Sequence, residues 1–166
     1  MSTRLILTVL FSSVFFLSSY TLAVGKPVSQ EKIKESIEKG AKFLYQNQNA
    51  TGWWSDSGLP ALTGLALVAL EMADATKLDS KYESERRRAY DYLTSLAKPD
   101  GSIHDGRLIN YNTACSLMAL SMSNETRYRP LIEKARAYIA ASQVDLGEKG
   151  QLDDPHDGGV GYNYKY

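Results

Sequence analysis

The stretch KGAKFLYQNQNATGWW, residues 39–54, has the composition of a helix end followed by a glycine turn and two tryptophans. Leu44 continues the apolar line of Ile33 and Ile37 at helical spacing, which predicts one buried face of an amphipathic helix. Gln48 stands at the expected end of this helix, where its side-chain amide can satisfy backbone groups that lack a partner there or at the start of the next helix. The stretch therefore predicts a helix and turn held together by side chains.

The turn that follows the helix contains Gly52 and leads into Trp53-Trp54. Asn and Gly are typical turn residues, and a tryptophan placed directly after a turn can fill the gap between two stacked helical pairs. Gly40 lacks a side chain, so we expect it to let a neighbouring backbone come close. All of these roles concern packing between helices.

Three segments of the chain are similar and each opens a unit: residues 39–44, 88–93 and 134–139. Their starting positions are separated by roughly 50 residues, which is the period of a two-helix repeat. The glycine turn recurs at Gly101-Ser102, and the first two turns precede the apolar runs 63–70 and 113–120. These recurrences predict stacked helical pairs.

After Gln143 the pattern stops halfway through a third unit, so that about two and a half helical pairs are expected. Gly159-Val160 stands in the place that Gly52-Trp53 holds in the first unit. Helical repeats normally end in a capping unit with a polar outer face. We therefore expect either a fragment of a longer protein or copies that self-associate to cover the open edges.

Residues that favour helix starts precede each expected helix or stand in its first turn: Ser29, Pro60, Ser80 with Glu83, Asn110 or Asn112, and Pro130. The first, third and fifth helices are amphipathic. The second and fourth, residues 60–74 and 111–123, are apolar nearly all round, which predicts burial on both sides. The expected fold is all-α, with apolar inner helices covered by amphipathic outer ones.

The composition is that of an ordinary globular protein, because 43% of the 166 residues are hydrophobic and 23% are charged. The 19 basic and 19 acidic side chains balance, so there is no electrostatic reason to expect nucleic acid as a partner. Cys115 is the only cysteine. The chain cannot form a disulfide within itself, and its stability must come from packing.

Residues 1–25 differ in composition from the rest of the chain. Arg4 is their only charged side chain, residues 5–17 form a mostly apolar run, and small residues follow around Ala23. This pattern is typical of a secretory signal peptide and predicts export of the mature part, residues 26–166. The alternative is an uncleaved anchor, although the run is short for a membrane span of about 20 residues.

Residues 39–54 resemble the QW motif, the repeat of squalene and oxidosqualene cyclases, whose relatives include the β-subunits of protein prenyltransferases. The positions that carry the resemblance are Lys39-Gly40, Leu44, Gln48 and Gly52-Trp53-Trp54. The resemblance covers residues 30–166 and implies part of an α/α toroid. It also implies isoprenoid or other lipid-like substrates, and we expect no cofactor in this chain.

The resemblance supplies no complete catalytic motif. Class II terpene cyclases protonate an alkene with the middle aspartate of a D-x-D-D motif, and the nearest string here, Gln151-Leu152-Asp153-Asp154, lacks the first aspartate. A solvated acidic turn is the alternative interpretation of this string. Prenyltransferases bind zinc through Asp, Cys and His, but the residue two before Cys115 is Thr113. We therefore expect no metal site at Cys115.

The only two histidines occur in the same tripeptide, in His104-Asp105-Gly106 and in His156-Asp157-Gly158. Both copies are expected in loops between an outer and an inner helix. A histidine beside a carboxylate can act as a general base, and two such pairs can share a metal. The alternative is turn chemistry of the Asp-Gly pair with an incidental histidine.

Five aromatic residues at turn positions are expected to line an apolar cavity that holds a prenyl chain: Trp53, Trp54, Tyr111, Tyr162 and Tyr164. The first four are the candidate binding residues. Packing between repeats is the alternative explanation. The pattern of residues 1–25 predicts an exported repeat protein, and the resemblance implies that it binds or acts on isoprenoid-like molecules. The alternative is a non-catalytic binding or scaffold module that uses the cavity or an open helical edge.

Overall fold

The computed structural model describes residues 28–74 and 82–163, and the regular elements of these residues are all helices. They are α1 (Gln30–Gln46), α2 (Pro60–Asp74), α3 (Glu83–Ser95), α4 (Ile109–Met122), the short 3-10 helix η2 (Thr126–Tyr128) and α5 (Arg129–Ala141). The expected all-α fold is confirmed for this part of the chain. None of the helices in it is both long enough and apolar enough to span a membrane.

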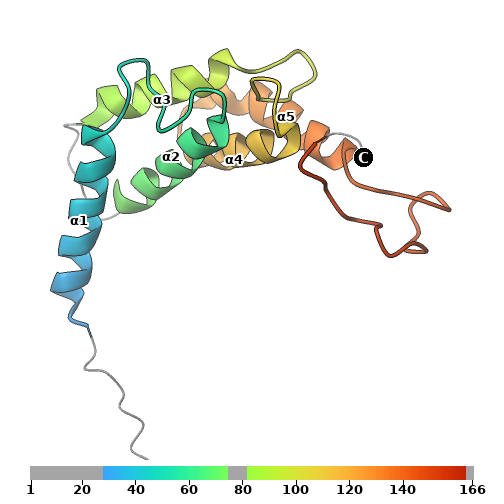
Figure 1. Ribbon diagram of the computed structural model, residues 1–166, viewed down its shortest axis with the longest axis horizontal. Helices are drawn as coiled ribbons and strands as arrows, with labels where there is room; N and C mark the ends of the chain where they lie inside the picture. Colours follow the sequence, from blue (N-terminus) through green and yellow to red (C-terminus); the bar gives the residue numbers. More distant parts are fainter. Residues whose placement is uncertain (1–27, 75–81, 164–166) are drawn as a thin grey trace, which may run out of the picture.

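The helices form two layers, with α2 and α4 side by side and α3 and α5 on one side of them (Figure 1). The contact between α2 and α4 is the most extensive one, and α1 packs on α2 at the left of Figure 1. The core lies between the layers, where burial of large aliphatic side chains supplies the main stabilising free energy. Its least exposed large apolar residues are Leu67, Leu70, Leu93, Ile103 and Leu120.

Gly64 allows the close contact between α2 and α4. A Cβ atom at this position would lie 2.6 Å from the carbonyl oxygen of Cys115, which is far inside van der Waals contact. The sequence led us to expect this role for Gly40, and that prediction is wrong, because no atom lies within 4 Å of the place of a Cβ there. Gly40 is on the exposed side of α1, whereas Ala41 and Tyr45 are buried.

Three of the expected helix-start residues hold the positions predicted for them. The hydroxyl oxygen of Ser29 caps α1 by accepting a first-turn backbone N–H at 3.3 Å. Pro60 is the first residue of α2, and Pro130 stands in the first turn of α5. Ser80 lies outside the described residues, and α3 begins at Glu83.

The prediction that Asn110 or Asn112 starts the fourth helix is wrong, since α4 begins at Ile109 and both asparagines lie buried within it. Each asparagine binds another segment instead. The side-chain oxygen of Asn112 accepts the backbone N–H of Ala61 at 2.9 Å and so caps α2. The side-chain amide of Asn110 donates to the carbonyl of Gly161 at 2.9 Å. These asparagines connect α4 to its neighbours.

The loops after α1, α3 and α5 share one pair of backbone hydrogen bonds. In each loop one residue donates its N–H across the turn and accepts an N–H from a glycine. In the first loop, Asn49 donates to Trp53 and accepts from Gly52, both at 2.9 Å. In the second, Lys98 donates to Ser102 at 2.8 Å and accepts from Gly101 at 3.0 Å. In the third, Val144 donates to Gly159 at 2.8 Å and accepts from Gly158 at 2.9 Å.

These bonds change the expected correspondence in the third loop. Gly158, rather than Gly159, takes the place of Gly52 and Gly101, and all three have positive φ angles, of 79°, 104° and 93°. Only glycine adopts such angles readily. Residues 145–157 lie between the two bonded ends of the third loop, and we call them the acidic loop because Asp145, Asp153, Asp154 and Asp157 belong to it.

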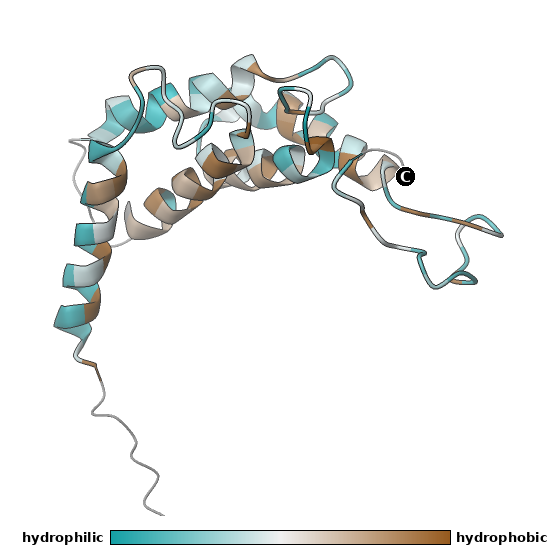
Figure 2. Cartoon of the chain, in the orientation of Figure 1, coloured by the Kyte–Doolittle hydropathy of each residue, from teal (hydrophilic) through white to brown (hydrophobic). Residues whose placement is uncertain are grey.

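The expectation that the second and fourth helices are buried on both sides is wrong for the described residues. Leu65 and Met72 of α2 are 41% and 65% exposed, and Met118 of α4 is 42% exposed. In Figure 2, α2 is hydrophobic or neutral in colour along most of its length. The outer helices cover only one side of α2 and α4, which leaves part of their apolar surface open.

Candidate functional site

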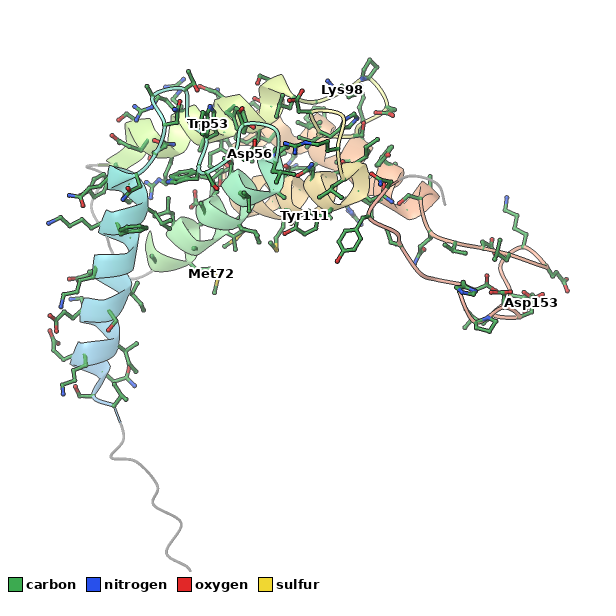
Figure 3. The ribbon with its side chains drawn as sticks, viewed as in Figure 1. Trp53, Asp56, Met72, Lys98, Tyr111 and Asp153 are labelled. Carbon is green, nitrogen blue, oxygen red and sulfur yellow. The ribbon has the colours of Figure 1, made fainter. Side chains whose placement is uncertain are left out.

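The exposed side of the two inner helices is apolar. It consists of Leu65, Ala69 and Met72 on α2 and of Ala114 and Met118 on α4, all of them exposed. Their spacing of three or four residues places the members from each helix on one face. We call this surface the inner face. Met72 and Tyr111 project from the side of the helices that lies away from α3 (Figure 3).

Tyr111 and Tyr162 extend the inner face at the start of α4. Their rings meet edge to face with centroids 5.9 Å apart, a favourable geometry for two aromatic rings. The carbonyl of Tyr162 accepts the backbone N–H of Asn110 at 2.9 Å, so the loop after α5 is fixed to α4 at this point. Two of the four predicted binding residues are therefore brought together, and Tyr164 lies outside the described residues.

Trp53 and Trp54 are not part of that surface. The side chain of Trp54 is 6% exposed and its indole N–H donates to the carbonyl of Leu44 at 2.8 Å, so this residue fills the space between α1 and α2, in the packing role predicted above. Trp53 lies on the α3 side of the molecule, opposite Tyr111 (Figure 3). The prediction that all four aromatic residues line one cavity is wrong.

Gln48 fastens the loop after α1 to the third helix. Its side-chain N–H group donates to the carbonyls of Gly52 at 3.0 Å and of Glu85 at 2.8 Å. Its side-chain oxygen accepts from the guanidinium of Arg88 at 3.1 Å. Since α1 ends at Gln46, the glutamine lies just past the helix and binds the first half of α3.

His104 has the hydrogen bonding of a neutral side chain. Its Nδ1 accepts the backbone N–H of Gly106 at 2.8 Å, which places the proton of the neutral ring on Nε2. Burial, with the charge of Lys98 as the next cause, lowers the pKa of His104. The nitrogen that remains available is a donor, so the ring is poorly prepared to accept a proton. The adjacent Asp105 is exposed.

The carboxylates of the acidic loop bind its own backbone. Asp157 accepts the N–H groups of Leu146 at 2.7 Å, Asp154 at 2.9 Å and Asp153 at 3.1 Å. These bonds, that of Leu146 first, lower the pKa of Asp157. A carboxylate with three backbone donors holds a loop in shape and is a weak acid catalyst.

His156 is bound to Asp154 rather than to the first His-Asp pair. Its backbone N–H and its ring Nδ1 lie 2.9 and 2.8 Å from the carboxylate of Asp154, and the backbone bond is the first cause of the lowered pKa of Asp154. Asp153, at the position of the proton donor in the cyclase motif, is exposed to water. The predicted catalytic residues thus form separate, locally bonded groups in two loops.

The described residues contain no group of three His, Cys, Asp or Glu side chains placed to hold a metal ion. No hydrogen bond or salt bridge between described residues joins His104 to His156. Burial raises the pKa of the Cys115 thiol, which makes it a weak nucleophile at neutral pH. His104 lines a hollow together with Asp100, Ile109 and Tyr138, and the inner face is the exposed apolar surface that we consider as a ligand site.

Sequence reasoning missed Leu65, Met72 and Met118 as members of the candidate site. Their spacing was visible, since Leu65, Ala69 and Met72 follow one face of a helix. The signal was lost because a helix that is apolar all round does not reveal which side its neighbours leave uncovered. No family model, curated protein or solved structure matches this chain.

Proposed function

We propose that this chain forms part of an α/α toroid of the kind found in squalene cyclases and prenyltransferase β-subunits, and that its inner face binds an isoprenoid or another apolar chain. The described residues bind this ligand without catalysing a reaction on it. The observation that carries the proposal is the exposed apolar stripe on the inner helices. Soluble proteins rarely expose contiguous apolar patches that have no binding role.

A bond that recurs between loop and inner helix supports the toroid. The backbone N–H of Trp54 donates to the hydroxyl of Thr63 in α2 at 3.2 Å. The backbone N–H of Ile103 donates to the hydroxyl of Thr113 in α4 at 2.9 Å. Each donor stands two residues after its turn glycine, so the two helical pairs share one local design.

A second recurrence supports a third pair that begins after α5. Asn112 caps the start of α2 through Ala61, and Asn163 accepts the backbone N–H of Ile109 at the start of α4 at 3.1 Å. An asparagine from the following unit thus caps the inner helix of the preceding one in both cases. The loop after α5 therefore approaches α4 as the start of an inner helix would.

The chemistry of the inner face suits an apolar chain. Met72 and Met118 are flexible and polarisable, so they adapt to ligands of variable shape. Tyr111 and Tyr162 provide aromatic surface at one end of the face. The five residues that define the face are uncharged, which favours a ligand that is apolar along its length.

The proposal is tested by titrating the full-length chain with a fluorescent farnesyl derivative. We expect saturable binding, and we expect the double variant Met72→Asp, Met118→Asp to bind at least about tenfold more weakly, because two carboxylates would have to lose water on contact with the ligand. The matched control is Phe43→Asp, since Phe43 is 63% exposed on the outer helix α1. Equal binding by the wild type and the double variant would contradict the proposal.

The second candidate function is that of a non-catalytic scaffold that holds a protein partner at an open helical edge. It is favoured by the groove beside α4 and α5 that is described next. Both candidates are proposed to act outside the cytoplasm, on the pattern of residues 1–25, which lie outside the described part of the chain.

A further inference from the structure

An open groove of about 600 Å³ is lined by α5, by Leu117 of α4 and by Val160 of the loop after α5. We call it the α4–α5 groove. Its apolar lining includes Leu117, Ala137, Ile139, Ala140 and Val160. Glu133 and Arg136 of α5 also line it. The groove is separate from the inner face, so the inference below does not depend on ligand binding there. In the toroid proposed above, a further inner helix would lie against this groove, and the test below separates that occupant from the one inferred here.

The corresponding place beside α2 and α3 is filled. Leu67 stands four residues after Thr63 and is fully buried, whereas Leu117, four residues after Thr113, is only half-buried. On the outer helices, Leu93 of α3 is likewise fully buried, but its counterpart Ile139 of α5 is half-buried. The helix α4 covers Leu67 and Leu93. No described residue covers Leu117 and Ile139 in the same way.

Two charges beside the groove lack partners within the described residues. Glu133 and Arg136 are exposed and stand three residues apart on α5, yet neither makes a salt bridge there. The same spacing on α3 does form one, between Glu83 and Arg86 at 2.8 Å. Small side chains follow on the same side of α5, at Ala137 and Ala140, so another helix can approach closely.

We infer that a second copy of this chain covers the α4–α5 groove by a two-fold contact. The two α5 helices run antiparallel, with Glu133 of each copy facing Arg136 of the other. A two-fold interface is self-complementary, because residue i of one copy meets residue j of the other and the reverse also holds. An acid and a base three residues apart meet this condition, and the apolar floor of each groove is then buried.

The charge pattern makes a sharp test possible with the full 166-residue chain. Analytical ultracentrifugation over a range of concentrations should show a dimer for the wild type. Glu133→Arg or Arg136→Glu alone places like charges opposite each other, and we expect each to weaken the dimer by about tenfold or more. The double variant E133R/R136E restores the pairing in reversed order and should recover most of the affinity.

A mixture of the two single variants provides a second readout. One variant then offers two positive charges and the other two negative ones, so they should form a heterodimer more tightly than either forms a homodimer. Lys42→Glu on the exposed side of α1 is the control and should change nothing. A wild type that stays monomeric, or single variants whose loss neither the double variant nor the mixture repairs, would overturn the inference and assign the groove to another occupant.

Discussion

Single carboxylates shape the acidic loop, and Asp157 is the main one. Its two oxygens accept three backbone N–H groups within the loop, while Asp154 accepts two donors from His156. Such bonds favour the ionised form, as the lowered pKa values of Asp154 and Asp157 indicate. The shape of the loop is therefore tied to the ionisation of these two side chains.

The first prediction concerns pH. The folded pKa values of Asp154 and Asp157 are depressed, so the ionised side chains stabilise the acidic loop. This stabilisation is fully present above the ordinary aspartate pKa of about 4 and is lost as the pH falls through the folded pKa values. We expect amide hydrogen exchange in residues 145–157 to accelerate below about pH 4, beyond the intrinsic effect of pH, and before the helices open. Asp157→Ala should show the same acceleration at neutral pH, whereas Asp105→Ala, in another loop, should not.

Roles that follow from local chemistry were predictable at the residue level. The cap by Ser29, the structural role of Gln48 and the packing of Trp54 all follow from residue type and the neighbouring sequence. The role of Gly40 was not predictable in this way, because the side of α1 that meets a neighbour depends on how the helix is rotated. Tyr111 and Tyr162 were predicted to lie near each other, and their rings do meet, but separating Trp53 from them required the positions of the layers.

At the level of elements, the close packing of α2 on α4 depends on Gly64, which has no side chain. We expect Gly64→Ala to destabilise the fold by about 1–3 kcal/mol, since its Cβ would overlap the backbone at Cys115. Gly40→Ala, in open space on α1, should stabilise the chain by about 0.5–1 kcal/mol through helix propensity. Urea unfolding of both variants measures whether their changes in the free energy of unfolding have opposite signs. A loss of stability in both, or in neither, would contradict the proposed packing.

The extents of the helices were largely predictable from apolar runs and start signals. The second helix was expected at residues 60–74 and has those bounds, whereas α4 begins two residues before the predicted residue 111. The asparagines misled the prediction because they bind neighbouring segments rather than starting their own helix: Asn112 caps α2, and Asn110 donates to the loop carbonyl of Gly161. A residue type favours a cap, but only the tertiary arrangement decides which helix receives it.

At the level of the whole molecule, the pattern of residues 1–25 makes a prediction about processing. Expression of the full chain with its own N-terminus in a secreting host should yield exported protein that begins near Lys26, because small residues precede that position. N-terminal sequencing or intact mass measurement of the exported protein identifies the cleavage site. Retention of Met1 on a membrane-bound product would favour the anchor.

The layer of inner helices and the layer of outer helices were predictable for residues 28–74 and 82–163, but the open surfaces of these layers were not. Periodicity indicates that a helix has an apolar side, yet it does not state whether a further helix covers Leu117 or Met118. The inner face and the α4–α5 groove both result from such uncovered sides. Opposite charges such as Glu133 and Arg136 are common on helices, and only the three-dimensional arrangement shows that these two make no salt bridge with another described residue.

The third loop is closed at its base by the two backbone bonds between Val144 and residues 158–159. The acidic loop between these bonds extends beyond the helices (Figure 1), although part of it lines a hollow together with Ala140 and Ala141 of α5. The sequence of that projection can therefore change in length without moving α4 or α5. For protein engineering, residues 148–150 are a natural place to graft an epitope or a fluorescent label that reports on the chain from outside its packed layers.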